Sequence, residues 1–265
     1  MQWLLQKFGS STGTLHWFHW LVISLSLVLT VGAWYISKQQ IEEKTRIQFN
    51  REASQVIALV KERMAKYEQA LWAGVAAIHS QSHGIDYAEW VRFSEALKID
   101  VRYPGINGIG VIHYVPPENL DRYLAEQRKD RPDFSIHPKH NKNEFWPITY
   151  VEPVAINLKA VGLDMAHETN RHTAGIKARD TGVAQITGPI TLVQDEKRTP
   201  GFLFYAPFYK GGAHSSVEMR QKHFIGMVYA PFIMWKLMKG TLRKEERRVG
   251  IKISDEAFIL HNEHI

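Results

Sequence analysis

The triplet Asp180-Thr181-Gly182 is the part of this sequence whose residue types point most directly to a reaction. The same triplet occurs in aspartic proteases, where two such carboxylates share one proton and activate a water molecule. In those enzymes it follows an apolar strand, whereas here it follows the charged, helix-forming run HTAGIKAR. The chain holds no second Asp-Thr-Gly or Asp-Ser-Gly, although a dimer could supply one. Because glycine commonly ends a helix in the left-handed conformation, the sequence favours a helix cap at Gly182 over a protease site.

Two pairs of histidines have spacings that could hold a metal ion or a haem. His16 and His19 lie about one helical turn apart and are mixed with tryptophans, which is typical of a helix end at a membrane interface. His137 and His140 lie in a loop rich in Pro, Asn and Lys, and no His-Glu-x-x-His occurs. We therefore predict interfacial and solvated histidines, with no metal site and no cofactor.

Acidic residues offer a second route to catalysis. Glu152 and Asp164 could pair as acid and base, but nothing in the sequence brings them together, and Asp164 can equally cap a following helix. No Walker phosphate loop and no Gly-x-Ser-x-Gly elbow occurs. We predict that the 265 residues of this chain do not form an enzyme. The alternative is a secreted or membrane-anchored hydrolase of α+β fold with an essential carboxylate such as Asp164 or Asp180.

The composition excludes two further classes of function. The 265 residues carry a net charge of +6 that is scattered along the chain. No Lys/Arg run is interleaved with aromatic residues, so we predict no nucleic-acid binding. Cysteine is absent, which excludes disulfides and thiolate chemistry.

Residues 15–37 form an apolar run without Asp, Glu, Lys or Arg. A helix of this length crosses a hydrocarbon core of about 30 Å, and aromatic residues lie toward both ends. We predict a transmembrane helix at 15–37 after a short tail at 1–14. A cleavable signal peptide is the alternative, because Val31-Gly32-Ala33 resembles a cleavage site. Counting Lys and Arg on the two sides leaves the orientation open.

Residues 38–80 contain no proline, and apolar or small residues recur there at spacings of three and four. This pattern predicts a long stalk helix whose apolar stripe needs a cover. Its own domain can cover the distal part, and a second copy can cover the part near the membrane. We predict a homodimer through the stalk.

After residue 80 the pattern changes to short helices and alternating strands. VAQITGPITL and TPGFLFYAPFYK read as strands joined by a polar turn, and RVGIKISDEAFILHNEHI reads as a hairpin. GIDYAEWVRFSEAL and ENLDRYLAEQRKD read as amphipathic helices. The sequence predicts an α+β fold with antiparallel sheets and helices to one side.

Six short motifs in this region occur in an order that resembles the CHASE domain, and the match runs from about residue 93 to the end. They are YPGINGIGVIHYV, YVEP, GLDM, ARDTG, ITGPITL and GFLFYAPFY. The resemblance implies a membrane helix and stalk followed by two PAS-like antiparallel sheets with flanking helices. The membrane-distal lobe (81–212) would bind a small ligand, and 213–265 would form the membrane-proximal lobe.

The resemblance also implies a function. CHASE domains are extracytoplasmic sensors of membrane histidine kinases and nucleotide cyclases. We therefore expect the sensing portion of a bacterial-type receptor in the cell inner membrane, with the sensor in the periplasm or outside and the short tail at 1–14 in the cytoplasm. Ligand binding would pass through the stalk to a cytoplasmic kinase or diguanylate cyclase, which these residues do not include. A ligand-free dimerisation module is a further alternative.

The resemblance places candidate ligand-binding residues on three segments. Thr187, Val193 and Tyr205 fall at pocket positions of cytokinin receptors, and Arg171 occupies the place of the Asp that binds adenine there. Since the guanidinium suits a carboxylate or phosphate, we expect an anionic small molecule. An exposed position on the helix is the alternative for Arg171. The predicted site is completed by Asp164, Phe202 and Phe204, although core packing explains the two phenylalanines equally well.

Overall fold

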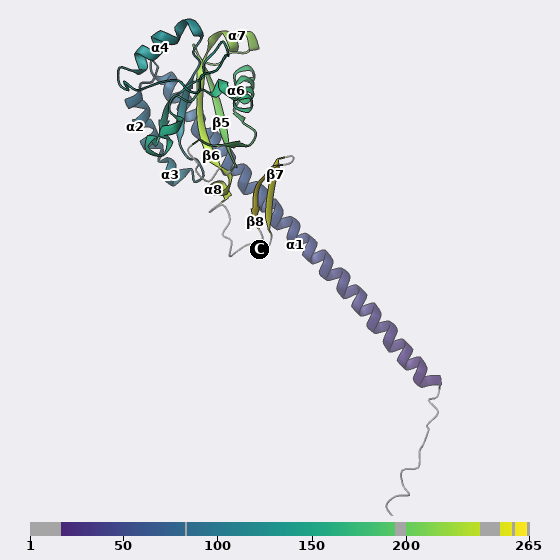
Figure 1. Ribbon diagram of the computed structural model, residues 1–265. Coiled ribbons are helices and arrows are strands. Elements are labelled where there is room, and N and C mark those ends of the chain that lie inside the picture. Colours follow the sequence, from purple (N-terminus) through teal and green to yellow (C-terminus); the bar gives the residue numbers. More distant parts are fainter. Residues whose placement is uncertain (1–16, 83, 194–199, 239–249, 256–257, 264–265) are drawn as a thin grey trace, which may run out of the picture. The chain divides into compact units, whose positions relative to one another are not determined.

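The computed structural model describes residues 17–82, 84–193, 200–238, 250–255 and 258–263 (Figure 1). The predicted cytoplasmic tail and His16 lie outside these residues. The chain divides into two compact units, Met1–Ser54 and Gln55–Ile265. Its helices and strands are α1 Trp17–Ser80, α2 Tyr87–Leu97, α3 Ile99–Arg102, β1 Ile109–His113, η1 Pro117–Asn119, α4 Leu120–Gln127, β2 Ile148–Glu152, α5 Val154–Asn157, η2 Leu158–Ala160, η3 Met165–His167, α6 Thr169–Thr181, β3 Gln185–Ile186, β4 Ile190–Thr191, β5 Pro200–Tyr209, α7 Val217–His223, β6 Phe224–Ile233, α8 Met234–Met238, β7 Ile251–Asp255 and β8 Phe258–Glu263.

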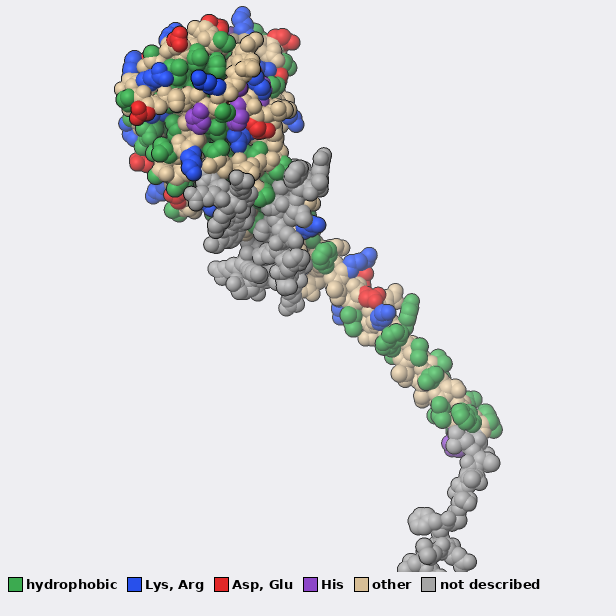
Figure 2. Space-filling model, in the orientation of Figure 1, with side chains coloured by type: hydrophobic (Ala, Val, Ile, Leu, Met, Phe, Trp, Pro, Cys, Tyr) green, Lys and Arg blue, Asp and Glu red, His purple; other side chains and the backbone are tan. Residues whose placement is uncertain are grey.

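The first unit contains the apolar start of α1. A window of 18 residues in this helix has a mean hydropathy of 1.8, and none of that window is buried. Figure 2 shows hydrophobic side chains on the surface of this part of α1. By length and composition the helix could therefore cross a membrane. The predicted span and stalk belong to one helix of 64 residues.

The second unit is built on a six-stranded antiparallel sheet. The strand order is β2-β1-β6-β5-β3, and β4 also pairs with β5. The longest pairing joins β5 to β6, from Gly201 opposite Ile233 to Tyr209 opposite Phe224. Because β6 lies between β1 and β5, the sheet continues past the lobe boundary that the sequence places at residue 212.

One face of this sheet packs against α1 and α2. The buried side chains there include Tyr67 and Leu71 of α1, Trp90 of α2, and Phe202 and Phe204 of β5. The close approach depends on Gly74, because a Cβ atom there would lie 2.9 Å from Cγ1 of Val228. A side chain at this position would therefore push the helix away from the sheet.

The opposite face of the sheet packs against α6 (Figure 1). Helices thus cover both faces, where the sequence predicted helices on one side. Gly182 ends α6 with φ 74° and donates its N–H to the carbonyl of Ala178. The helix cap predicted for the Asp-Thr-Gly triplet is therefore confirmed.

The predicted terminal hairpin is also present, as β7 paired antiparallel with β8. In the described part of the chain, these two strands form a sheet of their own. The architecture is α+β, with one six-stranded antiparallel sheet, flanking helices and the separate β7–β8 hairpin.

Candidate ligand-binding site

Arg171 lies in the first turn of α6 and points inward. Only 7 % of the residue is exposed, so the alternative of an exposed helix position is wrong. Its Nη2 donates to the carbonyl of Thr191 at 3.0 Å, and its Nε lies 3.7 Å from a carboxylate oxygen of Glu168. Nε has no hydrogen-bond partner in the described part of the chain. The sheet side of α6 therefore carries a buried cation with a donor left over.

Two tyrosines of the sheet surround this cation with further polar atoms. Tyr205 of β5 and Tyr229 of β6 are directly opposite each other, and both are buried. Neither hydroxyl has a hydrogen-bond partner among the described residues. Burial raises the pKa of both hydroxyls, and the positive charge of Arg171 lowers it. Since an unpartnered buried polar group costs about 1–3 kcal/mol, three such groups close enough for the charge of Arg171 to act on both tyrosines are unusual.

A small cavity lies beside these groups, with a volume of about 10 Å³. This is room for about one water molecule. Its walls come from β2, from η2 to the start of η3, from α6, from the two residues after β4, and from β5 and β6. The lining residues are Ile148, Ala160, Leu163, Met165, Arg171, Leu192, Val193, Leu203, Tyr229 and Pro231. The lining is apolar apart from Arg171 and Tyr229.

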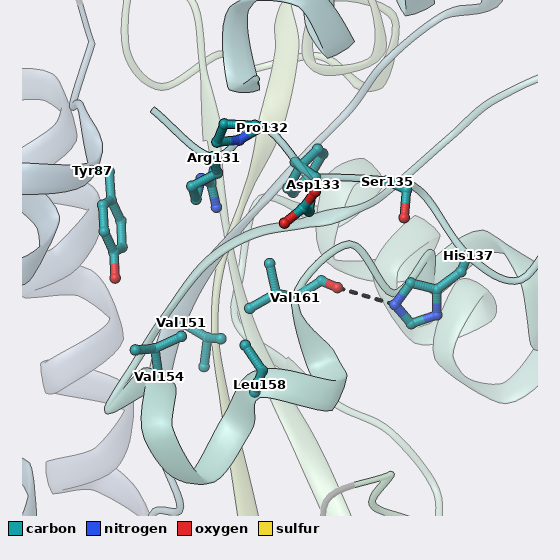
Figure 3. A pocket seen from close by; sticks show the side chains of 11 residues that line it. Tyr87, Arg131, Pro132, Asp133, Ser135, His137, Val151, Val154, Leu158 and Val161 are labelled. Atoms are coloured by element: carbon teal, nitrogen blue, oxygen red, sulfur yellow. Dashed lines mark hydrogen bonds between the residues drawn. The ribbon is translucent and has the colours of Figure 1, made fainter. Parts of the chain in front are cut away.

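A second, wider hollow of about 450 Å³ lies beside α2 and β2 (Figure 3). Figure 3 shows aliphatic side chains on one side of it and Asp133, Ser135 and His137 along the other. Several of its polar groups are already used within the fold. The hydroxyl of Tyr87 donates to Glu152 at 2.9 Å, and Nε2 of His137 contacts the carbonyl of Val161 at 3.0 Å.

Arg131 lies at one end of the same hollow. Its guanidinium donates to the carbonyl of Thr149 and to the side chain of Gln127, although its Nε is buried without a partner. Three rings surround the cation, with centroids at 5.4, 4.8 and 5.1 Å for Tyr87, Phe134 and Tyr150. These contacts hold the side chain as part of the core. The wider hollow therefore has the volume for a ligand, but most of its polar atoms are engaged.

Comparison with known protein families tests the resemblance found in the sequence. The CHASE domain family matches residues 83–262, which is more than half of the chain. The chain belongs to the CHASE domain family. The resemblance found in the six motifs is thereby confirmed. A CHASE domain is an extracytoplasmic sensor domain of signalling receptors. No curated protein matches the sequence.

The CHASE domain places three of the predicted ligand residues at or next to the small cavity. Val193 lines it together with Arg171 and is 39 % exposed, so the wall reaches the surface there. Thr187 is buried, and its Oγ1 accepts a hydrogen bond from the N–H of Leu203 at 3.0 Å. Thr187 therefore fixes the backbone of β5 at Leu203, whose own side chain lines the cavity.

Asp164 is fully buried in the CHASE domain, and protein groups engage both of its carboxylate oxygens. Oδ1 accepts from the N–H groups of Trp146 and Ala166, both at 2.8 Å, and Oδ2 contacts Nε2 of His140 at 2.8 Å. The contact with Ala166 caps η3, so the capping role predicted for Asp164 is confirmed. Its neighbours Leu163 and Met165 line the cavity, whereas its own side chain holds the wall together.

Phe202 and Phe204 lie on the other side of the sheet from this cavity. Successive side chains of a strand point to opposite faces. Leu203 and Tyr205 therefore pack toward α6, while Phe202 and Phe204 pack toward α1 and α2. The structure does not bring the two phenylalanines together with Arg171.

Tyr229 is the polar cavity residue that the sequence analysis missed, along with most of the apolar lining. A repeat in the sequence could have pointed to Tyr229, because Tyr-Ala-Pro-Phe occurs at 205–208 and again at 229–232. The two tyrosines of these repeats are the in-register pair. Among the described residues, no cluster of three or more His, Asp or Glu side chains could hold a metal ion.

Proposed function

We propose that this CHASE domain is the sensing portion of a transmembrane signalling receptor and binds a small anion in the cavity beside Arg171. One observation carries the proposal. The Nε of Arg171 and the hydroxyls of Tyr205 and Tyr229 are buried without hydrogen-bond partners among the described residues. A carboxylate or phosphate oxygen placed between them would accept hydrogen bonds from all three and would offset the buried charge.

The chemistry of these donors limits the class of ligand. A guanidinium only donates hydrogen bonds, and a phenol in this setting can donate one more. The site therefore favours an acceptor-rich, negatively charged group and disfavours an amine or the donor edge of adenine. A volume of about 10 Å³ fits a very small group, so a larger ligand would have to displace a wall. Val193 is the wall residue best placed to move aside, because its side chain is partly exposed to solvent.

The sheet offers a route by which such a ligand could act on α1. Strand β5 carries Tyr205 on the cavity face and Phe204 on the face that packs against α1. A shift of β5 or β6 on ligand binding would change the packing of Tyr67 and Leu71. We propose that α1 passes this bias through the inner membrane, within a homodimer, to a cytoplasmic kinase or diguanylate cyclase. The cavity itself would then face the periplasm or the exterior.

Thermal unfolding of the full chain in lipid nanodiscs tests the ligand. The panel consists of short carboxylates, amino acids, inorganic phosphate, nucleobases and nucleotides. A ligand at about 100 times its Kd adds about 2.7 kcal/mol, which raises the melting temperature by several degrees. We expect the shift from a small anion, and we expect Arg171→Ala to abolish it.

Arg179→Ala is the matched control, because Arg179 lies on the same helix and pairs with Asp180 at 2.7 Å. This variant should keep the ligand shift. An anion shift that survives Arg171→Ala would rule out the cavity as its site. The absence of a shift with every compound would favour a signal carried by another protein.

A further inference from the structure

Lys142 lies between two imidazoles at the edge of the segment that leads into β2. Its backbone N–H donates to Nδ1 of His140 at 3.1 Å, and its Nζ lies 3.2 Å from Nδ1 of His172 on α6. The other ring nitrogen of each histidine contacts a carboxylate. Nε2 of His140 is 2.8 Å from Asp164, and Nε2 of His172 is 2.7 Å from Glu144. One lysine thus joins two histidine–carboxylate pairs.

The hydrogen-bonding groups fix the protonation of both rings. A backbone N–H and an ammonium group can only donate, so each Nδ1 must accept. Each Nε2 must then carry the hydrogen and donate it to its carboxylate. Both His140 and His172 are therefore neutral in this arrangement, each in a defined tautomer.

The two pairs are shielded from solvent. The side chains of His140 and Asp164 are 10 % and 0 % exposed, and those of His172 and Glu144 are 13 % and 22 % exposed. The ring of Phe145 packs on His140 and that of Trp146 on His172, with centroids at 5.4 and 5.2 Å. The hydrogen bond from His172 lowers the pKa of Glu144, and burial opposes this shift.

Other charged or titratable groups face the pairs from the neighbouring elements. Next to Asp164, Nδ1 of His167 contacts its carbonyl, and the carbonyl of His137 accepts from its N–H. The charge of Arg179 lowers the pKa of Glu144. The pKa of Tyr114 is raised by burial and by the charge of Glu144 and lowered by that of Arg179. The N–H of His172 donates to the carbonyl of Glu168. Among these neighbours, Lys142 is the group whose contacts depend on an unprotonated Nδ1.

We infer that Lys142 is the moving part of an acid-sensitive latch, in which a proton from solvent on Nδ1 of His140 or His172 takes the place of the lysine. Protonation turns Nδ1 from an acceptor into a donor. At His140, the new Nδ1–H group then faces the N–H of Lys142, so two donors oppose each other. At His172, the imidazolium and the ammonium of Lys142 become two cations at the present contact distance of 3.2 Å. Protonation of His140 removes the contact of the Lys142 N–H, and protonation of His172 removes the contact of its Nζ. When both rings are protonated, both contacts are lost and the ammonium moves into solvent with its charge unchanged.

The two carboxylate contacts survive the same change. Each imidazolium still donates from Nε2, and its attraction to Asp164 or Glu144 increases with its charge. Acid therefore releases the residues around Lys142 without breaking the histidine–carboxylate pairs. A histidine side chain ordinarily changes its charge between about pH 5 and pH 8, so the test compares two pH values inside that range.

The latch adjoins the cavity at two points. Asp164 lies between Leu163 and Met165, and His172 follows Arg171 on α6. Any effect of pH on ligand binding rests on the proposed function. The release of Lys142 does not, because it needs no ligand.

Hydrogen exchange of the full chain in lipid nanodiscs tests the latch directly. Protection of the Lys142 amide, corrected for the intrinsic exchange rate, is compared at about pH 7.5 and about pH 5.5. We expect a loss of about tenfold for this amide, while β5 and β6 keep their protection. The ¹⁵N signals of labelled histidines should show protonation of Nδ1 over the same pH range.

Glutamine variants provide the decisive comparison. His140→Gln together with His172→Gln keeps an N–H donor at both positions and removes the titration. We expect equal protection at the two pH values in this double variant. His214→Gln with His223→Gln is the matched control, because these rings stack on each other at 4.4 Å and hydrogen-bond to the carbonyls of Lys210 and Met219. This control should keep the pH dependence of the wild type.

Two results would overturn the latch. One is equal protection of Lys142 at both pH values in the wild type. The other is an unchanged loss of protection in the double glutamine variant. If the double variant does not fold, the ¹⁵N signals decide, because a loss of protection without protonation of either Nδ1 also contradicts the inference.

Discussion

Tyr205 and Tyr229 stand directly opposite each other on β5 and β6, and each is the first residue of a Tyr-Ala-Pro-Phe sequence. Their hydroxyls are buried without partners among the described residues, and the charge of Arg171 acts on both. The opposite face of the same two strands packs against α1. The two tyrosines of the proposed site therefore lie on the same strands whose opposite face contacts the stalk helix α1.

Removing the hydroxyl of Tyr229 should not destabilise the ligand-free protein. Since this hydroxyl has no partner among the described residues, Tyr229→Phe should leave the free energy of unfolding unchanged or raise it by about 1 kcal/mol. Tyr67→Phe is the comparison, because the hydroxyl of Tyr67 donates to the carbonyl of Pro104. This second variant should lose about 1 kcal/mol. Equal losses in both, measured by chemical denaturation, would mean that Tyr229 has a structural partner.

A methyl group at Gly74 should separate α1 from the sheet. The added Cβ would lie 2.9 Å from Val228 and 3.2 Å from Trp90, so Gly74→Ala should cost about 1–3 kcal/mol. Gly32→Ala, on the same helix, meets nothing within 4 Å and should cost nothing. Melting temperatures of the two variants measure the difference. If Gly74→Ala melts with the wild type, the helix does not pack as closely as described.

Asp164 should behave as a structural carboxylate. Asp164→Asn removes the acceptor that faces His140 and places an N–H₂ group there, so we expect a loss of about 2–3 kcal/mol in the free energy of unfolding. Asp133→Asn, at the exposed rim of the wider hollow, should change it by less than about 0.5 kcal/mol. A fully stable Asp164→Asn protein that has lost a hydrolytic activity would instead support the hydrolase alternative.

His113 should make the fold sensitive to acid. Burial, assisted by the charge of Arg131, lowers the pKa of His113 to about 4. An unfolded histidine titrates near pH 6.5, so between these two values the unfolded chain binds a proton that the folded chain does not. The free energy of unfolding therefore falls as the pH decreases from about 6.5 to about 4, by about 2 kcal/mol at about pH 5.

Chemical denaturation at about pH 7 and about pH 5 measures this loss. His113→Gln should reduce it, whereas His79→Gln, at an exposed position, should leave it unchanged. Equal losses in wild type and His113→Gln would show that another group controls the acid response.

Local patterns in the sequence determined much of the fold. The spacing of apolar residues in 38–80 predicts a helix, and α1 contains all of it. Gly182 was recognisable as a helix cap because a charged, helix-forming run precedes it, and such a signal needs no distant partner. The family was also readable, because the six motifs lie along a single stretch of chain.

Contacts between residues far apart in the chain decided the features that the sequence left open. The buried face of α6 carries only small alanine and glycine residues beside Arg171, so the burial of Arg171 depends on where Thr191 and the sheet lie. The faces of Phe204 and Tyr205 follow from which helix covers each side of β5, and the role of Tyr229 follows from its register with Tyr205. Helix periods and caps are set by neighbours within a few residues, whereas burial and strand register are set by contacts between residues far apart in the chain.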